Sequence, residues 1–342
     1  APRLLFVSAR TPGALRARAR GLAAALRAVP DVTVDAVANE LRDGRRAFER
    51  RAVVVAATRE EAIEAFDALA AQDEAPPRVT SRDAILLFPG QGTQTAGAGK
   101  TLHATDAAFR EAIDRCIAAA GRVRGKSLRH WLFADDAATA EQLRATDIAQ
   151  PVLFALEYAL GHRLIAAGLR PTAMVGHSIG EFAAAALAGV MSPDDAMRAV
   201  VARGRLMAAM APGAMLAVRL PAEQLRPRLG ADVVIAAINA PRLCVVAGPD
   251  AAIATLEVAL MVDDIGCRRL QTSHAFHSPS MDEAAREFEA VMRSVPLHAP
   301  TIPFASCVTG APITAAEATD PAYWGRQLRE PVRFADGLAA LA

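Results

Sequence analysis

Apolar residues near the start of the chain fall into two short runs, and a longer amphipathic stretch follows each run. Short apolar runs favour strands, whereas apolar positions three or four residues apart favour helices. The predicted elements are strands at residues 3–7 and 52–57 and helices at residues 12–28 and 60–71. This order predicts a small α/β unit. Residues 72–82, with Pro76 and Pro77, indicate a connection to the rest of the chain.

The rest of the chain changes its pattern near residue 214. Before that point, strand-like residues 84–87 and 173–175 and helix-like residues 196–210 favour a larger α/β body. The pattern then shortens, with strands predicted at 215–219, 233–237 and 243–247 and helices at 222–228 and 250–260. Such an alternation fits a ferredoxin-like insertion. We therefore expect a domain at 1–82, a large subdomain at 83–213 and 275–342, and a small subdomain at 214–274.

The pentapeptide Gly-His-Ser-Ile-Gly at residues 176–180 lies between an apolar run and an alanine-rich, helix-like stretch. A serine between two glycines at a strand-to-helix turn is typical of a nucleophile elbow. The start of the following helix offers unpaired N–H groups and a partial positive charge, which suit a developing oxyanion. Ser178 is therefore a candidate nucleophile, although glycines beside a serine also mark ordinary turns.

Two further segments supply groups that a serine nucleophile needs. Residues 88–94, Phe-Pro-Gly-Gln-Gly-Thr-Gln, place a donor-rich loop at the carboxyl end of a predicted strand, where open α/β sheets bind ligands. Residues 274–277, His-Ala-Phe-His, add two imidazoles later in the chain. A serine hydroxyl needs a base within hydrogen-bond reach, usually a histidine. Either His274 or His277 can provide it.

Composition narrows the class of protein. The 38 basic and 37 acidic side chains are spread along the chain and nearly cancel, so we expect no nucleic-acid partner. The four cysteines, Cys116, Cys244, Cys267 and Cys307, lie far apart, which argues against a zinc site or a disulfide framework. The apolar runs are too short or too interrupted for a signal peptide or a membrane span, so we expect a cytoplasmic protein. The strand-like opening without methionine suggests a piece of a longer polypeptide.

From about residue 84 to residue 337, the chain resembles the malonyl-CoA:acyl-carrier-protein transacylase family. The resemblance is closer to the acyltransferase domains of type I polyketide synthases and animal-type fatty acid synthases. Besides the three segments above, the matching blocks are residues 203–207 (RGRLM), 239–241 (NAP), 245–249 (VVAGP) and 327–334 (QLREPVRF). Residues 5–10 and 51–56 resemble the linker between ketosynthase and acyltransferase. The resemblance implies an α/β-hydrolase-like large subdomain with an inserted ferredoxin-like small subdomain.

The resemblance also implies catalytic roles. Ser178 would attack an acyl thioester and hold the acyl group as an ester. His277, the last residue of its block, would be the base, and the backbone carbonyl of Gln327 would orient its imidazole. Backbone N–H groups of Gln91 and Ile179 would form the oxyanion hole.

Arg203 is the residue that the resemblance assigns to the substrate carboxylate, which malonyl-CoA carries and acetyl-CoA lacks. His274 and Phe276 resemble the block of malonyl-selecting domains, in which a bulky ring leaves little room for a branch at the α-carbon. Excluding one methyl group is typically worth about 1–3 kcal/mol, so some leakage of methylmalonyl is expected. His177 and Asn239 are further candidates for substrate contact.

We therefore expect an acyltransferase of polyketide biosynthesis that moves malonyl from malonyl-CoA to the phosphopantetheine thiol of an acyl carrier protein. No metal or redox cofactor and no membrane partner are expected, and a ketosynthase domain of the same polypeptide is the expected neighbour. Three alternatives remain: a serine hydrolase or thioesterase, a methylmalonyl-selective acyltransferase, and a non-catalytic spacer within a synthase.

Overall fold

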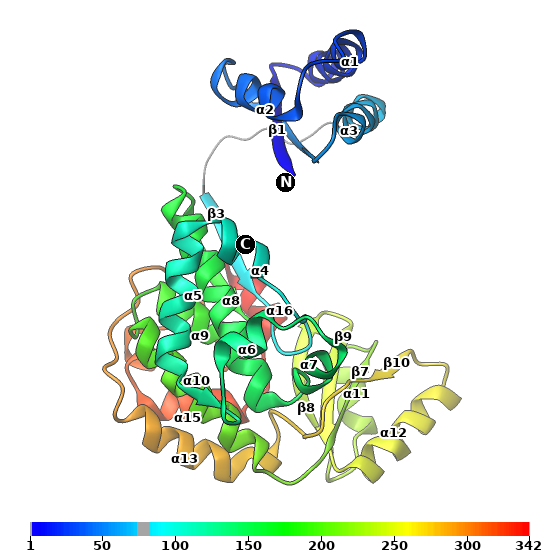
Figure 1. Ribbon diagram of the computed structural model, residues 1–342. Coiled ribbons are helices and arrows are strands. Elements are labelled where there is room, and N and C mark those ends of the chain that lie inside the picture. The colour runs from blue at the N-terminus through cyan, green and yellow to red at the C-terminus, as the bar shows by residue number, and fades with distance from the viewer. Residues whose placement is uncertain (1, 74–82, 342) are drawn as a thin grey trace. The chain divides into compact units, whose positions relative to one another are not determined.

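Two paired strands organise the N-terminal unit in the computed structural model, which describes residues 2–73 and 83–341 (Figure 1). The chain divides into two compact units, residues 1–82 and 83–342. In the first unit, β1 (Arg3–Ala9) pairs antiparallel with β2 (Arg50–Ala56) along its whole length. Helices α1 (Pro12–Ala28), α2 (Val34–Asp43) and α3 (Arg59–Ala71) complete the unit. Alternation along β1 buries Leu5, Val7 and Ala9 in a core shared with the helices.

The predicted strands and helices of this unit are confirmed, but α2 was missed. Each of the three helices of the N-terminal unit begins after a threonine whose side chain accepts a hydrogen bond from a backbone N–H of the first turn. These threonines are Thr11, Thr33 and Thr58. In α2, Val34, Ala38 and Leu41 follow at helical spacing and are buried. Thr33 and the helical spacing of these buried residues were the features of the sequence that indicated α2. Most of the predicted connection at 72–82, including Pro76 and Pro77, lies outside the described residues.

A three-stranded parallel sheet, in the order β11-β6-β3, lies in the large subdomain of the second unit. The elements before the insertion are β3 (Asp83–Phe88), α4 (Lys100–Thr105), α5 (Ala107–Ala120), β4 (Arg122–Val123), β5 (Lys126–Ser127), α6 (Leu128–Phe133), α7 (Ala137–Gln142), α8 (Thr146–Ala166), β6 (Arg170–Gly176), α9 (Gly180–Leu187) and α10 (Pro193–Ala208). Those after it are the 3₁₀ turn Pro279–Met281, α13 (Asp282–Met292), β11 (Phe304–Ala305), α14 (Ala315–Ala318), α15 (Pro321–Arg329) and α16 (Phe334–Leu341).

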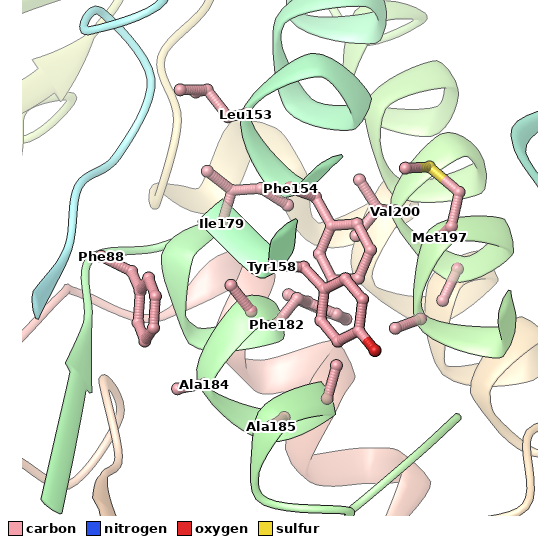
Figure 2. Close-up of a cluster of buried hydrophobic side chains, with 14 of the residues drawn as sticks. Phe88, Leu153, Phe154, Tyr158, Ile179, Phe182, Ala184, Ala185, Met197 and Val200 are labelled. Atoms are coloured by element: carbon pink, nitrogen blue, oxygen red, sulfur yellow. The ribbon is translucent and has the colours of Figure 1, made fainter. Parts of the chain in front are cut away.

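Helix α9 is buried between the sheet and the neighbouring helices α8 and α10. Figure 2 shows Phe182 of α9 in one hydrophobic cluster with Phe154 and Tyr158 of α8 and with Met197 and Val200 of α10. Four alanines, residues 183–186, follow Phe182 in α9, which lets the surrounding elements approach closely. The helix that follows the predicted nucleophile elbow is therefore held rigidly by the core.

The inserted small subdomain has the predicted ferredoxin-like order of elements. These are β7 (Ala214–Val218), α11 (Ala222–Leu225), the 3₁₀ turn Arg226–Arg228, β8 (Val234–Ala240), β9 (Leu243–Gly248), α12 (Asp250–Val262) and β10 (Cys267–Arg269). The strands form an antiparallel sheet in the order β10-β7-β9-β8. Backbone bonds at 2.9 Å, from Ile238 N–H to the Val332 carbonyl and from Val332 N–H to the Ala236 carbonyl, join β8 to the segment after α15. The insertion is thus fixed beside the end of α15.

No helix within residues 2–73 and 83–341 is long and apolar enough to cross a membrane. No group of three or more histidine, cysteine, aspartate or glutamate side chains in this part of the chain is placed to hold a metal ion.

Glu157 of α8 is a buried acid without a partner. Glu157 is 6% exposed, and neither of its carboxylate oxygens has a hydrogen-bond partner within the described residues. Burial raises the pKa of this carboxyl well above its ordinary value. The unfolded chain ionises at lower pH than the folded one, so the stability of this unit falls as the pH rises from the ordinary pKa toward the raised one.

Replacing this acid with a neutral amide, Glu157→Gln, is expected to raise the free energy of unfolding at pH 8 by about 1–3 kcal/mol. The gain should shrink at pH 5, because more of the wild-type carboxyl is then already neutral in both states. Both tryptophans, Trp131 and Trp324, lie in this unit, so urea titration followed by tryptophan fluorescence measures the change. A loss of stability at pH 8 would contradict the expectation.

Candidate active site

The turn between β6 and α9 has the geometry of a nucleophile elbow. Ser178 adopts a left-handed backbone conformation with φ of 53°. A Cβ atom at Gly176 would lie 2.1 Å from the Glu181 backbone nitrogen, and one at Gly180 would lie 2.5 Å from the Phe88 carbonyl oxygen. Only glycine fits at these two positions, which explains the Gly-x-Ser-x-Gly pattern. The turn presents the Ser178 hydroxyl at the wall of a cavity.

The structure brings His277 to Ser178. The Ser178 Oγ lies 2.7 Å from His277 Nε2, and His277 Nδ1 lies 2.9 Å from the carbonyl oxygen of Glu330. A carbonyl only accepts, so Nδ1 carries the proton and donates it to Glu330. His277 Nε2 is then the unprotonated nitrogen that accepts the serine hydroxyl. Of the two imidazoles that the sequence left open, His277 holds the position of the base.

The prediction that the backbone carbonyl of Gln327 orients the His277 imidazole was wrong. The carbonyl beside His277 Nδ1 belongs to Glu330 and not to Gln327. Helix α15 ends at Arg329, and Glu330 continues in an extended conformation with φ of −75° and ψ of 156°. Its carbonyl therefore lies outside the helical hydrogen-bonding pattern and is available to the imidazole. Gln327, one turn earlier, contributes its side chain, whose Nε2 donates to the Ser178 carbonyl at 2.7 Å.

The buried environment keeps His277 neutral. Burial, with the positive charge of Arg203 nearby, lowers the pKa of His277 to about 3. The imidazole is therefore unprotonated throughout the neutral range and can accept the serine proton.

Arg203 of α10 is a buried cation beside the nucleophile. It is 1% exposed, and its Nη1 donates to Gln150 Oε1 at 2.7 Å. Its Nη2 donates to Ser178 Oγ at 3.2 Å and to Gln327 Oε1 at 3.3 Å. Burial lowers the pKa of Arg203 to about 10, so the guanidinium remains charged at neutral pH. No carboxylate forms an ion pair with it within the described residues.

The two predicted oxyanion donors lie at the same cavity. Gln91 and Ile179 both line it, and neither backbone N–H donates to an acceptor in the described part of the chain. The Gln91 side chain is held instead, because its Oε1 accepts from the Thr146 hydroxyl at 2.8 Å and its Nε2 donates to the Arg144 carbonyl at 3.3 Å. The loop is thus fixed while its backbone N–H remains available.

The cavity has a volume of about 830 Å³ and is lined by both subdomains. Phe276 lines it, but His274 does not; the His274 ring stacks on Phe276 with centroids 5.7 Å apart. His177 and Asn239 both line it and are joined by a 2.8 Å bond between Nε2 and Oδ1. The structure therefore brings together all the predicted site residues except His274, which lies behind Phe276.

Sequence reasoning missed Gln150, Glu181 and Glu330. Gln150 and Glu181 are polar residues in otherwise apolar helical stretches, and both are buried. A buried polar residue in such a helix needs a partner, which was an available signal for a site. Glu330 acts through its backbone, so its side-chain type carried no signal.

Two family models match this chain. Residues 85–342 match the model of the acyl transferase domain, and residues 3–66 match that of the CurL-like C-terminal segment of polyketide synthases. The mycoketide-CoA synthase of Mycobacterium tuberculosis is 41% identical over 338 residues, which are 97% of this chain and 8% of that protein. The spectinabilin polyketide synthase system protein NorB of Streptomyces orinoci is 38% identical over 348 residues, 98% of this chain and 16% of that protein. The chain thus spans a small part of these relatives.

Solved structures give the same result. The acyl transferase domain of SpnD, crystallised in complex with 2-(pent-4-yn-1-yl)malonyl, superposes with a TM-score of 0.89 at 39% identity, over 99% of this chain and 81% of that one. The malonyl CoA-acyl carrier protein transacylase of Burkholderia pseudomallei superposes with a TM-score of 0.67 at 32% identity, over 76% of this chain and 87% of that one. With its Ser178–His277 pair in the expected fold, the chain belongs to the acyl transferase domain family, in the form found in type I polyketide synthases.

Proposed function

We propose that this domain transfers malonyl from malonyl-CoA to the phosphopantetheine thiol of an acyl carrier protein, through an ester on Ser178. Arg203 carries the proposal. A charged guanidinium buried 3.2 Å from the nucleophile, without an ion-pair partner in the described residues, leaves a carboxylate site at the distance of an acyl group. Malonyl supplies that carboxylate, and acetyl does not.

The first half-reaction follows from the Ser178–His277 geometry. The Ser178 Oγ attacks the thioester carbonyl while its proton passes to His277 Nε2, 2.7 Å away. The negative charge on the former carbonyl oxygen faces the backbone N–H groups of Gln91 and Ile179. When the carbon–sulfur bond breaks, the coenzyme A sulfur takes the proton from His277 Nε2. Malonyl remains on Ser178 as an ester.

The second half-reaction reverses these roles. The thiol of the carrier gives its proton to His277 Nε2 and attacks the ester carbonyl. The bond from carbon to Ser178 Oγ breaks, and that oxygen recovers the proton from Nε2. The Glu330 carbonyl, 2.9 Å from Nδ1, holds the imidazole in the tautomer that both steps need.

Two features of the cavity support the choice of donor. Phe276 is 8% exposed and lines the cavity, so its ring restricts the space for a branch on the acyl α-carbon. The exposed Arg268 also lines the cavity and has no ion pair or hydrogen bond from its side chain within residues 2–73 and 83–341. A free cation at that position suits a phosphate of coenzyme A or of phosphopantetheine.

Hydrolysis is the less favoured alternative. In a serine hydrolase triad the base is usually oriented by a carboxylate, whereas the group at His277 Nδ1 is the backbone carbonyl of Glu330. A hydrolase also has no use for the buried charge of Arg203.

We also propose that residues 1–82 connect this domain to a ketosynthase in the same polypeptide. The match of residues 3–66 to a segment of polyketide synthases supports this. No metal or redox cofactor is part of the proposed chemistry.

The test is the intact mass of the protein after brief incubation with malonyl-CoA, methylmalonyl-CoA or acetyl-CoA. We expect a malonyl adduct, with methylmalonyl transferred about 10- to 200-fold more slowly because one methyl group must be excluded. Phe276→Ala should narrow that difference. Methylmalonyl labelling that is faster than malonyl labelling would favour the methylmalonyl-selective alternative. Release of free malonate without an adduct would favour the hydrolase, and neither adduct nor release would favour the spacer.

A further inference from the structure

Glu181, the second residue of α9, is a fully buried acid directly after the elbow. Its Oε1 accepts from the Tyr323 hydroxyl. Its Oε2 accepts from Gln327 Nε2 at 3.1 Å and from the Cys307 backbone N–H at 3.3 Å. The reaction as derived above does not use this carboxyl group, and Glu181 does not line the cavity.

The side-chain amide of Gln327 connects Glu181 to Arg203. A guanidinium only donates, so the Gln327 oxygen must face Arg203 Nη2, 3.3 Å away. The amide nitrogen then faces the other way, toward Glu181 Oε2 and the Ser178 carbonyl. The orientation of the amide is therefore determined at both ends, by a cation on one side and by an acid on the other.

The contacts of Glu181 are those of an ionised carboxylate. The Tyr323 hydroxyl lies near both Glu181 Oε1 and Ser306 Oγ, but Ser306 Oγ already accepts the N–H groups of Val308 at 3.1 Å and Thr309 at 3.0 Å. The single phenolic proton is therefore directed to Glu181. With the phenolic proton so placed, all three contacts donate to the carboxylate. Burial raises the pKa of Glu181 from its ordinary value, and these hydrogen bonds oppose that rise.

We propose that Glu181 is a positioning residue for substrate selection, which acts through Gln327 to fix the Arg203 guanidinium beside Ser178. The inference rests on the proposed function and deepens it. A carboxylate directly on Arg203 would neutralise the cation and occupy the place of the substrate. A carboxylate one amide away stabilises the buried cation without pairing with it directly, so the guanidinium can still pair with an acyl carboxylate.

The test compares acylation of Ser178 by malonyl-CoA and by acetyl-CoA in Glu181→Gln, Gln327→Met and the double variant. In Glu181→Gln we expect kcat/KM for malonyl-CoA to fall on the order of 10- to 100-fold, because a charge-assisted contact that orients Arg203 is lost. Acetyl-CoA makes no contact with Arg203 through a carboxylate, so its kcat/KM should change by less than about 3-fold. Rates come from the time course of intact mass.

The double variant tests whether Glu181 acts through Gln327. In the Gln327→Met background, adding Glu181→Gln should lower the malonyl-to-acetyl ratio by less than about 3-fold further, because the connection is already broken. Additive losses would overturn the proposal. Equal losses for the two substrates in Glu181→Gln would also overturn it, since they would indicate a structural role alone.

Glu157→Gln is the matched control. It replaces another buried acid of the same unit, on α8, that does not line the cavity, and it should leave the malonyl-to-acetyl ratio unchanged. Should Glu181→Gln not fold, Tyr323→Phe removes one donor to Glu181 and should lower the ratio about 2- to 10-fold. No change in that ratio would contradict the proposal. A wild-type protein that takes acetyl as readily as malonyl would refute the proposed function itself, whatever the variants show.

Discussion

Acyl-enzyme formation should be lost in Ser178→Ala and slowed about 10²- to 10⁴-fold in His277→Ala. The first variant removes the only oxygen in hydrogen-bond reach of His277 Nε2 within the described residues, and the second removes the base that accepts its proton. Intact mass after incubation with malonyl-CoA, followed over time, measures both. A Ser178→Ala protein that acquires a malonyl ester at the wild-type rate would show that another residue is the nucleophile.

The pH dependence of acylation by the wild-type protein tests the protonation state of His277. Because burial lowers the pKa of His277 to about 3, the imidazole stays neutral as the pH falls through its ordinary value. A base whose pKa is lowered stays unprotonated at lower pH, so the active form of the protein persists as the pH falls. Single-turnover acylation should therefore be flat between about pH 5 and pH 8. A loss of rate centred near pH 6.5 would contradict the buried, neutral imidazole.

Arg203→Ala should lower kcat/KM for malonyl-CoA roughly 100- to 1,000-fold while acetyl-CoA is accepted about as well as before or better. Removing one partner of a buried charge pair costs about 3–5 kcal/mol, because the remaining carboxylate is left buried without a partner. Acetyl-CoA carries no such charge. The measurement is the ratio of the two acylation rates in one preparation.

Arg205→Ala is the control for Arg203→Ala, since Arg205 lies two residues later on the same helix and is exposed. It should leave both rates unchanged. Acetylation of Arg203→Ala itself shows that Ser178 and His277 remain assembled in the variant. A preference for malonyl that survives Arg203→Ala would remove the basis of the proposed function.

The nucleophile elbow was predictable because its cause is local. Gly176 and Gly180 are required by backbone atoms within a few residues or on the adjacent strand, so the pattern itself carries the geometry. Helix α2 also had a local signal in Thr33 and its spaced apolar residues, and it was missed because its stretch is short and highly charged.

The orienting carbonyl was not predictable from the sequence block alone. Gln327 and Glu330 lie three residues apart, and which carbonyl reaches His277 depends on where α15 ends. Helix ends are the least certain part of any pattern. Partners from distant segments, such as Gln150 to Arg203 and Gln327 to Glu181, depend on tertiary packing that no local pattern contains.

Both subdomains build the wall of the cavity, whereas its reacting groups come from the large subdomain alone. Ser178, Arg203 and His277 belong to the large subdomain, whereas Met215 and Val245 belong to the inserted one. Substitution at Met215 or Val245 therefore changes that part of the cavity wall without replacing any reacting group. The part of the wall that the insertion supplies is thus separate in sequence from the reacting groups, whereas Arg203 and Phe276 share the large subdomain with them.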